Sequence, residues 1–186
     1  AIGGDGFYFE NTNLEMSYNL IVSPGVGLEL TNSSEGSIIN NTIVTLDNAE
    51  YGIKVSDLSS PIIRNNIVQG YAIGIQVDNG QTNMNITHNA LWDISGDQFS
   101  GIAIAPQIGE YNTFNNNSDV SDIYGNIYVD PMFVNQDSMD FRLQLSSSCI
   151  DAGYEGSSLN IDGSITDIGA FLSVLFGCTD ELSCNY

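Results

Sequence analysis

The stretch IIRNNIVQGYAIGIQVDN (residues 62–79) combines two short apolar runs with a pair of asparagines, Asn65 and Asn66. The apolar runs are too short for helices and indicate strands. Buried amide groups must find hydrogen-bond partners, so asparagines are unusual at the edge of a hydrophobic core. The position of this pair therefore needs a structural reason.

The stretch contains one of five similar segments: SYNLIV, INNTIV, IRNNIV, THNALW and EYNTFN, which begin at residues 17, 39, 63, 87 and 110. The third residue of each segment is asparagine and the fifth is apolar. Successive asparagines are 22, 24, 24 and 23 residues apart. A fixed period of this length is the signature of stacked repeats. The asparagines are Asn19, Asn41, Asn65, Asn89 and Asn112.

A second motif, Gly-apolar-x-apolar, runs in phase with the first. It begins at Gly6, Gly27, Gly52, Gly74 and Gly101. The alternation predicts a strand with one buried face. Glycine at each start suits a corner that needs positive φ or close backbone approach. The middle residues, which should face outward, are Tyr8, Glu29, Lys54, Gln76 and Ala103.

The two motifs together predict an all-β parallel solenoid of about five to six coils over residues 1–117. Successive coils would pair through main-chain bonds at roughly 4.8 Å. Equivalent asparagines would then lie above one another and bond through their amides, as an Asn ladder that includes Asn65. A β-sandwich would give turn signals at shorter spacing, but no constant residue with this period.

Residues 6–117 resemble right-handed parallel β-helix proteins, the group that includes pectate-lyase-like and alginate-lyase-like enzymes. The handedness follows from this resemblance and not from the spacing. The resemblance also implies that a polysaccharide is a candidate substrate.

The period stops after Asn117, and residues 118–176 resemble the closing segment of many secreted bacterial β-helix proteins. The matching motifs are Asp130-Pro131, Asp140–Leu143, Cys149–Gly153 and Asp167–Phe171. Ser148 stands where that pattern has Pro, and Thr166 stands where it has Arg. We expect an irregular C-terminal capping segment that covers the open edge of the last coil.

The final stretch GCTDELSCNY (residues 177–186) resembles an element of large secreted proteins of Bacteroidota. In those proteins it begins a further small module or a linker, and export often uses type IX secretion. The resemblance implies an extracellular or cell-surface location. Cys178 and Cys184 are close enough in sequence for a local disulfide, which would leave Cys149 as a buried free thiol.

The net charge is −20, from three Lys and Arg against 23 Asp and Glu. This charge argues against nucleic acid and against anionic membrane surfaces as partners. No apolar run reaches the roughly 20 residues needed for membrane insertion. Neutral glycans, a basic partner or divalent cations are compatible with this charge. No cofactor is expected, although Asp- and Asn-rich turns such as 78–80 are suited to Ca²⁺.

The residue before each repeat asparagine gives a second column, Tyr18, Asn40, Arg64, His88 and Tyr111. Uronate lyases need a cation for the substrate carboxylate and a base. Arg64, His88, Tyr18 and Tyr111, with Lys54 on the outer face, are the candidates for these roles. The alternative is a partly exposed column of ordinary polar side chains. No zinc cluster and no distinctive pair of carboxylates is present.

These observations favour a non-catalytic extracellular β-helix module of a larger secreted or cell-surface protein. Such a module would act as a rigid spacer or as an adhesion or glycan-binding surface, with a glycan or another cell-surface or secretion protein as partner. The alternative is the C-terminal part of a polysaccharide lyase or hydrolase of the pectate-lyase-like class.

Overall fold

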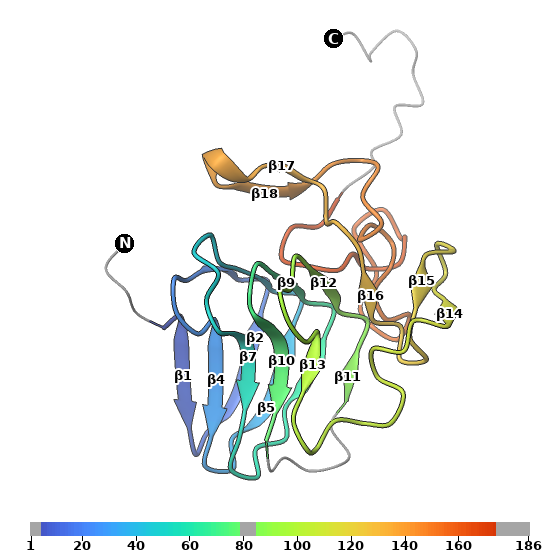
Figure 1. Cartoon of the computed structure of the whole chain (residues 1–186). Coiled ribbons are helices and arrows are strands. Elements are labelled where there is room, and N and C mark those ends of the chain that lie inside the picture. Colours follow the sequence, from blue (N-terminus) through green and yellow to red (C-terminus); the bar gives the residue numbers. More distant parts are fainter. Residues whose placement is uncertain (1–4, 79–84, 174–186) are drawn as a thin grey trace, which may run out of the picture.

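The computed structural model describes residues 5–78 and 85–173 (Figure 1). Within these ranges the only helical element is the 3₁₀ turn η1 (Gln136–Ser138), and no helix is long and apolar enough to cross a membrane. Strands β1–β12 form four coils of three strands each. The predicted all-β parallel solenoid is thus confirmed.

Each coil contributes one strand to each of three sheets. Sheet A contains β1 (Phe7–Glu10), β4 (Leu28–Thr31), β7 (Tyr51–Val55), β10 (Ile73–Val77) and β13 (Phe99–Ser100). Sheet B contains β2 (Asn13–Ser17), β5 (Glu35–Ile39), β8 (Ile62–Arg64) and β11 (Ile86–Thr87). Sheet C contains β3 (Leu20–Val22), β6 (Thr42–Val44), β9 (Ile67–Gln69), β12 (Ala90–Trp92) and β16 (Ile127–Tyr128).

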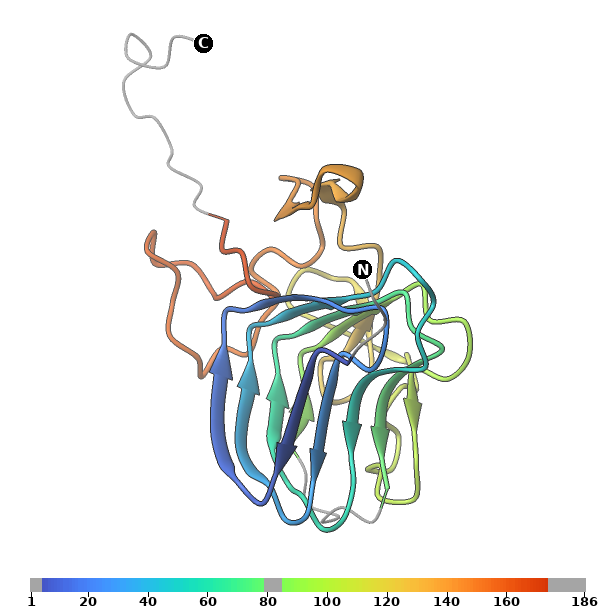
Figure 2. The ribbon, with the colours of Figure 1, turned by 90° about the vertical axis from the view of Figure 1, so that its left-hand side faces the viewer.

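Neighbouring strands of these three sets pair in parallel. Figure 2 looks along the stack from its N-terminal end and shows the coils one behind another. Sheet C is then extended by β15 (Val120–Ser121) and β14 (Thr113–Phe114), which pair antiparallel. The last sheet is the hairpin of β17 (Phe133–Asn135) and β18 (Asp140–Leu143).

The expected number of coils, five to six, was too high. The described residues form four complete coils, and only β13 and β16 continue the parallel stack beyond them. Gly101–Ile104 does not form a strand but lies in a turn, and Ala103 is buried instead of facing outward. The strand that continues sheet A after β10 is β13, which directly precedes Gly101 in the sequence.

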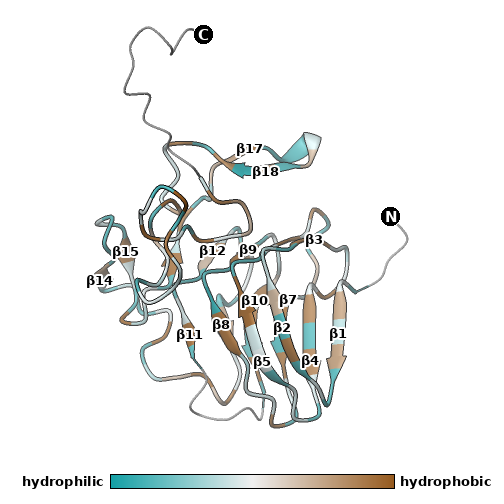
Figure 3. Cartoon of the chain, turned by 180° about the vertical axis from the view of Figure 1, so that it is seen from behind, coloured by the Kyte–Doolittle hydropathy of each residue, from teal (hydrophilic) through white to brown (hydrophobic). Residues whose placement is uncertain are grey.

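The interior of the coils is a continuous apolar core. On sheet A, Leu28, Ile53 and Ile75 lie in one column and are fully buried. Between the inward residues, Tyr8, Glu29, Lys54 and Gln76 pair in register on the outer face. The alternation along β4 is visible in Figure 3. Stacking of identical columns lets short strands share one core.

Glycines line the corner between sheets C and A because this backbone lies against the core. A Cβ atom at Gly6, Gly27, Gly52 or Gly74 would come within 3.0 Å of an inward side chain of sheet C, respectively Ile21, Ile43, Val68 and Leu91. None of these four glycines has positive φ. Close backbone approach, and not positive φ, therefore explains glycine at these four positions.

Asparagines of successive coils form a hydrogen-bonded column, which we call the inner ladder. At each step the backbone N–H and the Nδ2 group of one asparagine donate to Oδ1 of the next, at 2.9–3.0 Å. The four later rungs are fully buried. Their Nδ2 groups also donate to carbonyl oxygens of the preceding coil. The rungs are Asn19, Asn41, Asn66, Asn89 and Asn126.

Two residues assigned to the ladder from the sequence lie elsewhere. Asn66, not Asn65, occupies the rung of the third coil. Asn112 is exposed, and Asn126 takes the fifth rung after a gap of 37 residues. The chain between β12 and β16 leaves the coil path, which breaks the period near 23.

Asn65 belongs to a second column, which we call the outer corner column, between sheets B and C. Its members are Tyr18, Asn40, Asn65 and His88, with φ of 57°, 54°, 55° and 54°. Asparagine tolerates this left-handed conformation better than most residues. Arg64 precedes this column and pairs in register with Thr87 of β11. An Asn-Asn pair thus supplies one amide to each column.

The C-terminal segment lies along the outer face of sheet C, outside the coils, as the orange and red ribbon in Figure 2 shows. Val44, Ile67, Ala90 and Ile127 of sheet C form a second apolar core with residues of that segment. Its members include Phe133, Phe141, Leu143, Cys149, Ile150, Ala152 and Ile168. We expected this segment to cap the last coil. From Phe133 onward it instead covers the side of the stack, along sheet C, and we call it the lateral cover.

The outer corner column binds this cover through its amides. Asn40 Nδ2 donates to the carbonyl oxygens of Asp167 (2.7 Å) and Gly169 (3.3 Å). Asn65 Oδ1 accepts from the backbone N–H of Tyr154 (3.0 Å), and its carbonyl oxygen accepts from Gly169 N–H (2.8 Å). These contacts satisfy polar groups at the edge of the second core.

We expect the substitution Asn66→Leu to lower the free energy of unfolding by about 2–4 kcal/mol, because the buried N–H of Asn41 and its neighbours lose their partners. Urea unfolding followed by circular dichroism measures this loss. Gln76→Leu on the outer face of sheet A is the control, with a change within about 0.5 kcal/mol. Equal stability of the two variants would contradict a structural role for the inner ladder.

Candidate functional site

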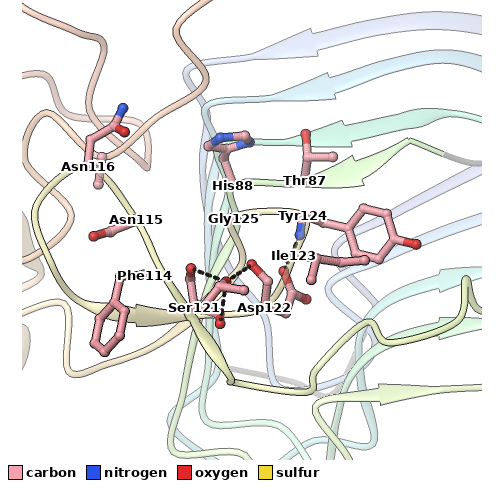
Figure 4. Close-up of a pocket in the computed structure, with 12 residues that line it drawn as sticks. Thr87, His88, Phe114, Asn115, Asn116, Ser121, Asp122, Ile123, Tyr124 and Gly125 are labelled. Carbon is pink, nitrogen blue, oxygen red and sulfur yellow. Dashed lines mark hydrogen bonds between the residues drawn. The ribbon is translucent and has the colours of Figure 1, made fainter.

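A cavity of ≈ 490 Å³ opens where the coil path is interrupted, between sheet B and the antiparallel strands β14 and β15 (Figure 4). Its walls come from three parts of the chain: the end of β11, the β14–β16 insertion and Ala152 of the lateral cover. The lining residues are Thr87, His88, Thr113, Phe114, Asn115, Asn116, Ser121, Asp122, Ile123, Tyr124, Gly125 and Ala152.

Asp122 is a buried carboxylate that ends the inner ladder. Asn126 donates from its backbone N–H to Oδ1 (2.9 Å) and from Nδ2 to Oδ2 (3.0 Å) of Asp122. The N–H groups of Tyr124 and Gly109 donate to the same carboxylate at 2.8 Å. Asp122 thus takes the place that the next asparagine would occupy. Four N–H donors stabilise its negative charge.

His88 lies on the cavity wall with its imidazole against Gly125. A Cβ atom at Gly125 would meet His88 Nε2 at 2.8 Å, so a larger residue would displace the ring. The Nδ1 atom is buried and has no hydrogen-bond partner. Burial, and secondarily the Arg64 guanidinium, lowers the pKa of His88 below its ordinary value. His88 is therefore neutral at pH 7.

Tyr154 of the lateral cover connects His88 with Arg64. The Arg64 guanidinium lies 4.0 Å from the centroid of the Tyr154 ring, and its Nε donates to Thr87 Oγ1 at 3.2 Å. The imidazole of His88 contacts the same ring edge-on, at 5.4 Å between centroids. A stacked guanidinium stabilises the cover by a cation–π interaction.

The remaining polar groups of the cavity are mostly engaged within the insertion. Thr113 Oγ1 lies 3.1 Å from Ser121 Oγ. Asn115 Oδ1 accepts from the N–H groups of residues 117 and 119, and Asn116 Nδ2 donates to Glu155 Oε1 at 2.7 Å. The cavity therefore offers hydroxyl and amide groups and an exposed aromatic ring, Phe114, but no unpaired carboxylate.

The structure brings only two of the five candidate catalytic residues together, Arg64 and His88. Lys54 is on the outer face of sheet A, where Nζ lies 2.9 Å from Glu29 Oε1. Tyr18 belongs to the first coil and is exposed. The Tyr111 hydroxyl is buried without a partner, and burial raises its pKa. Neither the hydroxyl of Tyr111 nor that of Tyr18 lines the cavity.

Sequence reasoning missed Asp122, Tyr154 and Phe114 as site residues. Asp122 lies in the insertion, where no repeat indicates its position. Phe114 was aligned with the apolar fifth position of the repeat segments, but it lies in the antiparallel strand β14 and is exposed. Tyr154 is 66 residues from His88 in sequence, and no local pattern links the two. One local signal was present in the sequence: Gly125, whose φ is positive, directly precedes Asn126, the fifth rung of the inner ladder.

The residues considered for metal binding and for a disulfide lie partly inside and partly outside the described ranges. Among residues 5–78 and 85–173, no three His, Cys, Asp or Glu side chains are grouped closely enough to hold a metal ion. Cys178 and Cys184, and most of the Ca²⁺ candidate turn 78–80, lie outside the described residues. Cys149 is a buried free thiol, and burial raises its pKa to about 12.

A family model described as "Right handed beta helix region" matches residues 1–119 of the 186. No curated protein and no solved structure shows a significant match to the chain. The matched region contains the four coils and the insertion as far as Asp119.

His88 should make stability depend on pH. Its pKa is lower in the folded than in the unfolded chain, so the unfolded state binds more protons over the window between these values. The contribution of His88 to stability should therefore be complete well above its ordinary pKa of about 6.5 and should fall as the pH drops below that value. Urea unfolding of the native chain and of His88→Gln at each pH measures this term. The difference between them should shrink at low pH. A constant difference would contradict the assignment.

Proposed function

The chain belongs to the right-handed β-helix family, and from that premise we propose that it is a non-catalytic module of a larger secreted or cell-surface protein. In this proposal the module is a rigid spacer that presents an adhesion or glycan-binding surface. The observation that carries the proposal is the engagement of all three basic side chains with internal partners.

A uronate lyase must neutralise the substrate carboxylate with a cation. Lys54 is paired with Glu29, and Arg142 makes a bidentate pair with Asp140 at 2.6 and 2.8 Å. Arg64 is stacked on Tyr154. The sequence contains no other Lys or Arg. A substrate carboxylate would have to displace one of these contacts against a net charge of −20.

The candidate bases are also poorly suited to proton abstraction. Hydrogen bonding to Glu29 raises the pKa of Lys54, which keeps its ammonium group protonated. Burial raises the pKa of Tyr111. His88 is neutral, but its Nδ1 is buried. These environments support a structural use of the three side chains more than a catalytic one.

Rigidity follows from the way the coils are joined. Each coil is bonded to its neighbours along three sheets and through the inner ladder, and the lateral cover joins the outer corner column. Such a stack resists bending because neighbouring coils share one core. The sequence resemblances and the acidic charge support three further parts of the proposal. These are the extracellular location, a glycan or surface-protein partner and a Ca²⁺ role of acidic turns.

The alternative is the C-terminal part of a polysaccharide lyase or hydrolase. The observation in its favour is that Arg64 and His88 contact the same Tyr154 ring beside a cavity. A cation, an imidazole and a phenol would then lie within one cluster. Activity measurements distinguish the two proposals.

We expect no cleavage of alginate, pectate or a neutral glycan by the purified chain, with or without Ca²⁺. Salt of sea-water strength gives the fair test, since the Debye length there is well under 10 Å and surface repulsion is screened. Absorbance of unsaturated products and new reducing ends are the measurements, with an active lyase as positive control. Cleavage that disappears in Arg64→Ala or His88→Ala would replace this proposal by the alternative.

A further inference from the structure

We infer that the N-terminal edge of the stack, formed by β1, β2 and β3, is a junction that a further parallel coil of the larger protein occupies. This inference rests on the proposed function, because it states how the module is joined to the rest of that protein. Two observations carry it: the open strand edges of the first coil and the direction of the inner ladder.

Three open strand edges lie together at the N-terminal edge. Within the described residues, β1, β2 and β3 each pair with one neighbour only, respectively β4, β5 and β6. Figure 2 shows this first coil in front of the others. Phe7 of β1 is 44% exposed, whereas its register partner Leu28 is fully buried. The interface that joins neighbouring coils therefore ends in an open edge with an apolar side chain in part exposed, which suits pairing with further strands.

The inner ladder has a direction, because each rung donates to the rung of the following coil. The first rung, Asn19, gives its backbone N–H and its Nδ2 group to Oδ1 of Asn41, both at 3.0 Å. Within the described part of the chain, no group donates to Oδ1 of Asn19 itself. Asn19 is also partly exposed, whereas the later rungs are fully buried. The ladder thus presents a free acceptor at this edge, which an amide donor would complete.

The opposite end of the ladder is closed. The carboxylate of Asp122 has no donor of its own, and it already accepts the backbone N–H and the Nδ2 group of Asn126. Sheet C then continues through the antiparallel strands β15 and β14 instead of a further parallel coil. The ladder can therefore be extended only at the N-terminal edge.

A second copy of the chain does not match this edge. In a head-to-tail contact it would present Asp122, which brings no donor to Asn19. In a two-fold contact, the free Oδ1 acceptors of both copies would face one another, and the exposed Glu10 and Glu15 of each copy would come together. A net charge of −20 on each copy adds to this repulsion. The matching occupant is a parallel coil with an asparagine at its inner corner.

The test supplies such a coil. In the extended variant, a copy of residues 27–44, which contains β4–β6, is fused before Ala1, so that five residues separate the copy from Gly6. This length lies between those of the native connections from β3 to Gly27 (four residues) and from β6 to Gly52 (seven residues).

The copied strands can repeat on β1–β3 the register that β4–β6 have with these strands in the native stack. Leu28 would then pair with Phe7, and Ile43 with Ile21, without like charges in register. The copied Asn41 would bring its N–H and Nδ2 groups to Oδ1 of Asn19.

Hydrogen exchange followed by mass spectrometry measures the docking on residues 7–22, which contain β1–β3. Backbone protons of this segment should exchange at least about tenfold more slowly in the extended variant than in the native chain, because the new coil covers their edge. In the matched control, the copy carries Asn41→Asp, which removes the Nδ2 donor and sets a carboxylate beside Oδ1 of Asn19. This control should lose most of the gain.

Unchanged exchange of residues 7–22 in the extended variant would overturn the inference, and so would equal protection by the Asn41→Asp copy. Analytical ultracentrifugation provides a further check. A dimer of the native chain that the extended variant does not form would assign the edge to a second copy, which also overturns the inference. None of these results concerns glycan cleavage, by which the non-catalytic proposal is tested, so the two proposals fail under different observations.

Discussion

The structure depends on one interaction: the hydrogen bonds from each inner-ladder asparagine to Oδ1 of the asparagine in the next coil. Where sheet B turns into sheet C, the backbone N–H of each rung and a carbonyl oxygen of the preceding coil are paired with asparagine side chains. A side-chain amide provides one acceptor and two donors, enough to join each corner to the next. Asp122 ends this column, because its two oxygens accept the last donors and need no further rung.

The conformation of the same corner also determines how the lateral cover is attached. The residue before each rung must adopt left-handed geometry, so its side chain points away from the interior, toward the outside of sheet C. In the second and third coils this residue is another asparagine, which binds the backbone of the lateral cover. In the fourth coil it is His88, which instead contacts Tyr154 and borders the cavity. The corner conformation thus connects the fold with the candidate site.

The sequence predicted the parallel solenoid and the corner glycines, because stacked columns impose a period that side chains reveal. It could not separate Asn65 from Asn66, since both fit the period within one residue and only the backbone conformation distinguishes them. Asn126 was missed because an irregular insertion lengthens that step to 37 residues. The cavity was missed for the same reason: its walls come from that insertion and from a segment distant in sequence, where no repeat operates.

Hydrogen exchange of the asparagine side chains tests the ladder most directly. In chain labelled with ¹⁵N at asparagine, the Nδ2 protons of Asn41, Asn66, Asn89 and Asn126 should exchange far more slowly than those of the exposed Asn116 and Asn117, because opening requires separation of stacked coils. Asn65 should also be slower than Asn116 and Asn117, but should lose this protection when the lateral cover detaches. Exchange of Asn66 as fast as that of Asn117 would contradict the account.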